Sequence, residues 1–136
     1  MVEGAIVLSV LALMLFGGLE LSLVVVRYNT MSACARSLGR LATLRGSRAT
    51  VAAPWGPGEL SLKANANHPA AQHVAGLLAA VDARDVDILM QWPDNSNESG
   101  NRVRVRVSCR HQPVTGIASW CAPRELSATS EMIIEY

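Results

Sequence analysis

The sequence predicts an α+β protein in which one long N-terminal helix is followed by a small domain with a second helix and a three-stranded antiparallel sheet. Three observations predict this arrangement. Residues 4–26 form an apolar run with one charged residue, a glutamate, and residues 31–42 carry apolar side chains at helical spacing. Residues 86–136 contain three runs in which apolar and polar side chains alternate, as they do in half-buried strands.

The apolar run from Gly4 to Val26 is predicted to be a membrane span. As a helix it is about 35 Å long, enough to cross the roughly 30 Å hydrocarbon layer with some tilt. Its length, and the absence of basic residues before it, favour a retained anchor over a cleavable secretory signal, which is the alternative. Arg27 and Tyr28 stand where interfacial anchors are expected.

Two glutamates mark this run, Glu3 at its head and Glu20 inside it. A charged side chain within a membrane helix costs on the order of 2.5–3.5 kcal/mol on insertion scales, so Glu20 is expected to have a function there. We expect it to contact another helix; the alternative is a position near the headgroups. The small residues Gly17, Gly18 and Ser22 would permit close helix approach, or they are ordinary residues of a membrane helix.

The helix is predicted to continue beyond the membrane to Arg48, since Arg45 and Arg48 suit a last helical turn. We therefore divide the chain into a helix at residues 1–48, with its span at about 4–26, and an extracytoplasmic α+β domain at residues 49–136. Residues 50–67 are rich in proline, glycine and asparagine and are predicted to form a loop.

Within the domain we predict a helix over Pro69 to Ala83 and strands over residues 86–92, 102–110 and 126–136. The middle strand places valines and Cys109 on one face and four arginines on the other. The second helix or the outer half of the long helix is expected to cover the valine face. The arginines are expected to pair with acids on the neighbouring strands, namely Asp87, Glu131 and Glu135. A short turn or helix is predicted over residues 116–120.

The composition and motifs do not indicate an enzyme. The 136 residues have a net charge of +1, which gives no support for a nucleic-acid partner. The sequence has no G-x-S-x-G turn and no glycine-rich phosphate loop. His68, His73 and His111 lack a metal-ligand spacing, and we expect surface or loop roles for them. We predict no catalytic, cofactor-binding or metal-binding residues.

Three cysteines leave two interpretations open. Cys109 and Cys121 are close enough in sequence to form a disulfide, which would contribute about 3 kcal/mol in the chain-entropy model and would fit an oxidising periplasm. Cys34 would then be a buried helix residue. Alternatively, all three are small hydrophobic side chains.

Several segments resemble the TadE-like family. Residues 1–8 (MVEGAIVL) resemble its V-E-F-A opening, and residues 15–21 (LFGGLEL) are similar to its F-G-x-x-E segment. Ala35, Arg36, Gly39 and Arg40 match best in a third, arginine-containing segment, and residues 103–108 and 126–132 are also similar. The resemblance covers most of the chain, and the first two segments carry its specificity.

The resemblance implies a type IV pilin-like fold and a minor pilin or pseudopilin of a Tad-type (Flp-type) pilus assembly or secretion system. In that family a prepilin peptidase removes a short basic leader, and a glutamate near the mature N-terminus docks one subunit onto its neighbour. Carried over by residue, Glu3 would be that glutamate, and Glu20 is a second candidate assembly contact. The implied partners are other pilin or pseudopilin subunits, the inner-membrane assembly platform, the peptidase and membrane lipid.

The implied location is the inner membrane, as a single-pass protein with its domain in the periplasm or outside the cell, and incorporation into the pilus is part of this expectation. The arginines after the span would by themselves favour a cytoplasmic domain. Two other classes of protein compete with this interpretation. One is a membrane-tethered exported enzyme or ligand-binding domain unrelated to pili, and the other is an envelope anchor that never polymerises.

Overall fold

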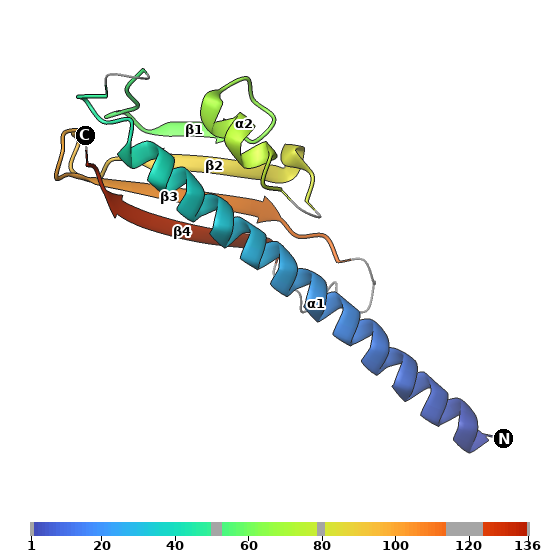
Figure 1. Cartoon of the computed structure of the whole chain (residues 1–136). Coiled ribbons are helices and arrows are strands. Elements are labelled where there is room, and N and C mark those ends of the chain that lie inside the picture. Colours follow the sequence, from blue (N-terminus) through green and yellow to red (C-terminus); the bar gives the residue numbers. More distant parts are fainter. Residues whose placement is uncertain (1, 50–52, 79–80, 114–123, 136) are drawn as a thin grey trace.

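The computed structural model describes residues 2–49, 53–78, 81–113 and 124–135. A 42-residue helix, α1 (Val2–Thr43), crosses a four-stranded antiparallel sheet and extends well beyond it at its N-terminal end (Figure 1). The strands are β1 (Leu60–Lys63), β2 (Val86–Gln91), β3 (Arg102–Arg110) and β4 (Glu125–Ile133), and they follow one another in the sheet in chain order. A short helix, α2 (Pro69–Ala75), and a 3₁₀ turn, Ala83–Asp85, complete the domain.

The predicted α+β class and the long apolar helix are confirmed, but the sheet has four strands rather than three. The additional strand, β1, lies within the segment that the sequence predicted as a loop. It is a four-residue edge strand held by antiparallel pairing with β2, in which Leu60 lies opposite Met90. So short a strand has too few residues to show an alternating pattern, and the surrounding prolines, glycines and asparagines conceal it.

Both helices end earlier than the sequence predicted. α1 ends at Thr43 rather than at Arg48. The backbone oxygen of Thr43, its last residue, accepts a hydrogen bond from the Glu135 backbone N–H at 3.4 Å. The Thr43 oxygen thus bonds the segment after β4 and not a further turn of α1, which was expected to continue to Arg48. α2 ends at Ala75 rather than Ala83, and Gly76 follows it as the C-cap, with its backbone N–H donating to the Gln72 oxygen. The turn predicted over residues 116–120 lies outside the described residues.

One sheet face and the outer half of α1 form the core. β3 buries its valines and Cys109, as the alternation predicted, and α1 packs across β3 and β4. Gly39 permits the close approach, since a Cβ atom there would lie 3.0 Å from the Met132 sulfur. The outer half of α1 therefore covers the valine face, with α2 adding a smaller part of the same core: Ala70, Ala71 and Val74.

The opposite sheet face is polar, and of the three predicted acidic partners Glu131 is the one that pairs with arginines among the described residues. Arg104 lies opposite Glu131 in the register, and their side chains approach to 2.9 Å. Arg102 pairs with Glu131 at 3.3 Å and with Asp94 at 2.9 Å. Asp87, in contrast, is paired with Lys63 on β1 at 3.8 Å. Exposed pairs of this kind contribute little energy and mainly favour one strand register.

Candidate functional site

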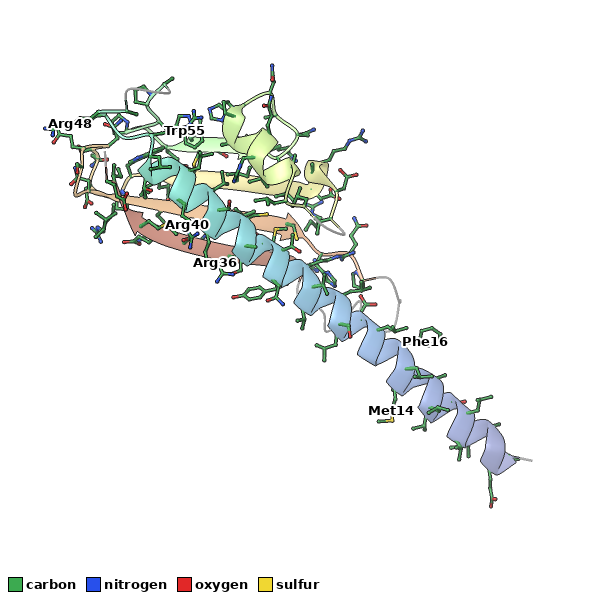
Figure 2. The ribbon with its side chains drawn as sticks, viewed as in Figure 1. Met14, Phe16, Arg36, Arg40, Arg48 and Trp55 are labelled. Carbon is green, nitrogen blue, oxygen red and sulfur yellow. The ribbon has the colours of Figure 1, made fainter. Side chains whose placement is uncertain are left out.

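The helix α1 has two parts with different surroundings, and the change occurs at Glu20. From Val2 to Leu19 nearly every side chain is exposed, and all of them except Glu3 and Ser9 are uncharged and apolar or glycine. Met14 and Phe16 lie on this part, clear of the domain (Figure 2). Beyond Glu20 one side of the helix packs on the domain, with buried residues that recur at helical spacing: Met31, Cys34, Ala35, Leu38 and Ala42.

The other side of the outer half faces away from the sheet. Arg36 and Arg40 are exposed there, one helical turn apart (Figure 2). They provide a positive surface on the packed part of α1. The free part of the helix, in contrast, carries one charged group, Glu3, among its described residues up to Leu19.

Glu3 and Glu20, the two predicted assembly residues, lie in very different environments. Glu3 is exposed in the first turn of α1. Glu20 is buried, with 5% of its side chain exposed, and lies against the domain of its own chain. They stand about 25 Å apart along the helix, so they do not form one site.

Glu20 faces a histidine that immediately follows β3. Its Oε1 lies 3.7 Å from Nε2 of His111, whose ring is fully buried. The distance is longer than a hydrogen bond, so the attraction between the two side chains is electrostatic. The His111 backbone N–H donates to the Arg124 oxygen at 2.9 Å and thereby fixes the residue at the end of the sheet.

Arg27 contacts the same histidine from two helical turns further along α1. Its Nη1 lies 2.9 Å from Nδ1 of His111 and 3.4 Å from the backbone oxygen of Gln112. Because a guanidinium can only donate, Nδ1 of His111 accepts and the ring proton resides on Nε2, which is the nitrogen nearest Glu20. We call Glu20, Arg27 and His111 the helix–domain clasp.

The clasp holds the imidazole in its neutral form. Burial lowers the pKa of His111, and the positive charge of Arg27 lowers this pKa further, while the Glu20 carboxylate opposes both effects. A neutral ring accepts from Arg27 and directs its Nε2–H toward Glu20, although at 3.7 Å this N–H makes no hydrogen bond among the described residues. The clasp is therefore a charged pair joined through a neutral histidine.

The sequence predicts a surface or loop role for His111 and an interfacial role for Arg27, whereas the His111 ring is buried and the Arg27 guanidinium points into the domain. The other two histidines serve local structure. His68 caps α2 by accepting from the Ala70 N–H at 3.2 Å, and His73 hydrogen-bonds the Ser37 hydroxyl at 2.7 Å. One feature of the sequence did indicate the clasp. Glu20 and Arg27 are two helical turns apart and lie on the same side of α1 as the apolar residues that begin at Met31.

A hollow of about 580 Å³ lies beside the clasp, and His111, Asp87 and Cys109 are among its lining residues. The His111 ring is fully buried and turned toward α1, and Cys109 is 1% exposed. Neither side chain is therefore presented to a substrate. In the part of the chain that the structure describes, no three His, Cys, Asp or Glu side chains are grouped to hold a metal ion.

The proposed disulfide stays a prediction. Cys109 is buried on the core face of β3, at the end of the strand that leads toward Cys121. Cys121 lies outside the described residues. Cys34 is buried in α1, as expected, and burial raises the pKa of its thiol.

These features define a class of protein: a small α+β domain carried by a long helix whose free, apolar N-terminal part is a candidate membrane anchor. The family model of the TadE-like protein matches residues 1–40, which is nearly all of α1. The resemblance to the TadE-like family is thus confirmed over this segment, which includes both glutamates. No curated protein matches the chain, and no solved structure matches it.

Proposed function

We propose that this chain is a minor pilin or pseudopilin of a Tad-type, type IV-like pilus assembly or secretion system and acts in adherence. The observation that carries the proposal is the free part of α1, which is apolar and exposed on all sides, in a segment that matches the TadE-like family. Such a surface is stable in lipid or against other apolar helices. A pilin-like subunit uses both surroundings in turn.

In this proposal α1 holds the chain in the inner membrane as a single-pass protein, with its domain in the periplasm or outside the cell. The subunit then packs its free helix against other pilin or pseudopilin subunits at the assembly platform. A prepilin peptidase is the expected processing partner. The protein is structural rather than enzymatic, in keeping with its family.

Glu3 is the residue that we propose to guide this assembly. It is the one carboxylate exposed on the free part of α1 described by the structure, at the end furthest from the domain. A carboxylate among apolar helices is costly unless a positive group neutralises it. The terminal amine of a neighbouring subunit would supply that charge, and the pair would fix the axial position of one helix against the next.

The packed half of α1 supports this mechanism because it makes the subunit one body. The core beneath Met31 and Leu38, together with the clasp, joins the helix to the domain along more than half of its length. A subunit built in this way can leave the bilayer without changing the angle between its helix and its domain. The competing enzyme or ligand-binding function is less well supported, because His111 and Cys109 beside the hollow are buried and Asp87 is the exposed one of these three side chains.

The test is the substitution Glu3→Gln in the native host, with Glu98→Gln as the matched control on an exposed domain loop. We expect the Glu3 variant to remain in the membrane fraction at the normal amount, while pilus yield and surface adherence fall at least tenfold. The Glu98 variant should behave like the unchanged chain. Normal pilus yield and adherence with Glu3→Gln would overturn the assembly role.

A further inference from the structure

We infer that the membrane ends between Leu19 and Glu20, so that the span reaches from the first turn of α1 to Leu19 and the edge of the domain formed by residues 110–112, 124 and 125 rests on the phospholipid headgroups. This inference rests on the proposed membrane anchoring. It differs from a span over residues 4–26, which the apolar run of the sequence favours. The partner that we assign to this edge of the domain is the surface of the bilayer.

Backbone without regular structure lies beside α1 between Glu20 and Arg27. Residues 111–113 follow β3 without regular structure, and His111 and Gln112 contact α1 between Glu20 and Arg27. Irregular backbone does not occur in contact with hydrocarbon, where its polar groups lack hydrogen-bond partners. A membrane edge at Val26 would submerge this segment, including the exposed side chain of Gln112.

Glu20 is buried by the domain. Its carboxylate is covered by protein and faces His111, and Arg27 lies on the other side of the same ring. The clasp therefore provides Glu20 with a polar protein environment at the point where α1 leaves the bilayer. A carboxylate in this position needs no partner from within the hydrocarbon.

The length of the free part of α1 also fits this boundary. Glu3 and Glu20 lie about 25 Å apart along the helix, close to the roughly 30 Å hydrocarbon thickness, so that Glu3 reaches the headgroups opposite the domain. Among the described residues that connect to β3 and β4 at this end, the exposed ones that would then meet the headgroups are polar or charged: Arg110, Gln112, Arg124 and Glu125. The exposed apolar side chains of α1 beyond Glu20, such as Leu21 and Val25, would lie within the headgroup layer. The headgroup layer offers phosphates to the arginines and water to the remaining groups.

The test is labelling of single introduced cysteines by a membrane-impermeant maleimide in sonicated vesicles, which present both membrane sides. The substitutions are Leu15→Cys, Leu21→Cys and Val25→Cys, at positions whose side chains are 61%, 66% and 50% exposed, so that lipid and not the domain controls their access. Tyr28→Cys is the accessible control, and the unchanged chain gives the background from its own cysteines. The full chain is expressed in a host without a pilus system, so that no other subunit covers the helix.

We expect Leu15→Cys to be protected until detergent is added, and Val25→Cys and Leu21→Cys to be labelled to at least half the extent of Tyr28→Cys. Protection of Leu15, Leu21 and Val25 together would overturn the inference and leave the membrane anchoring standing. Labelling of Leu15→Cys without detergent would overturn the anchoring itself. The two failures are thus distinguishable.

Discussion

The guanidinium of Arg27 lies 2.9 Å from the imidazole of His111, a residue 84 positions away in the chain. This contact fastens the middle of α1 to the end of β3. The contacts of Glu20 and Arg27 with His111 mark the boundary between two parts of α1. The part beyond Glu20 packs on the domain, and the part before Glu20 is free for lipid and for other subunits. The free part is where the TadE-like segment and Glu3 are located.

The clasp should contribute measurably to stability. We expect His111→Ala to lower the free energy of unfolding by about 1–3 kcal/mol, because the part-buried Arg27 hydrogen bond is lost and a cavity remains in place of the buried ring. The matched control is His73→Ala, which removes an exposed hydrogen bond to Ser37 and should cost less than about 1 kcal/mol. Urea unfolding of the chain in detergent, followed by tryptophan fluorescence, measures both. Equal losses in the two variants would contradict the role of the clasp.

The clasp should also make stability depend on pH. Because the pKa of His111 is lowered in the folded chain, the unfolded chain binds more protons once the pH falls below the usual histidine value of about 6.5. The free energy of unfolding should therefore decrease from pH 7 downward, and the decrease should stop below the folded-state pKa. In His111→Gln this part of the slope should disappear. An unchanged slope in His111→Gln would show that His111 is not held neutral.

The close contact between α1 and β4 depends on Gly39. A side chain there meets the Met132 sulfur at 3.0 Å, and Met132 is only partly buried and can shift. We expect Gly39→Leu to cost about 1–3 kcal/mol of folding free energy through overpacking, and Met132→Ala in the same chain to restore part of it. Unfolding by urea compares the single and double variants, with Arg36→Leu on the exposed side of the helix as the control. The prediction fails if Met132→Ala makes the loss larger.

A glycine beside Trp92 is required by both conformation and space. Gly56 has a φ of +88°, and a Cβ atom there would lie 2.5 Å from the Trp92 ring, whereas Gly58 has nothing within 4 Å. We expect Gly56→Ala to destabilise the domain by about 2 kcal/mol and Gly58→Ala to change stability by less than about 0.5 kcal/mol. Thermal unfolding followed by circular dichroism measures the difference. Similar midpoints for the two variants would contradict this arrangement.

Much of the fold could be predicted because its periodicity is strong. β3 alternates arginine and valine from Arg102 to Val107, and the core stripe of α1 repeats at helical spacing, so burial on one side dictates both elements. β1 could not be predicted, because four residues carry too little pattern and their pairing with β2 is a tertiary contact. The end of α2 at Gly76 shows the same limit, since apolar residues beyond it continued the helical spacing.

The candidate site was predictable only in part. The sequence indicates that Glu3 and Glu20 are unusual, because each is a charge beside an apolar run. It does not indicate that Glu20 faces His111, because that contact joins residues far apart in the chain. Extending the stripe from Met31 back through Arg27 to Glu20 would have placed both charged residues on the domain side of α1.

The most direct test of the proposed assembly is photo-crosslinking from the free part of α1 in pilus-producing cells. Phe16 is about half exposed there, and p-benzoylphenylalanine in its place changes the side chain little. The control carries the probe at the exposed Leu77 of the domain. We predict that the Phe16 probe forms a covalent adduct with another pilin-like subunit and that the adduct is lost with Glu3→Gln. A Phe16 probe that yields only the monomer while pili assemble normally would contradict the proposal.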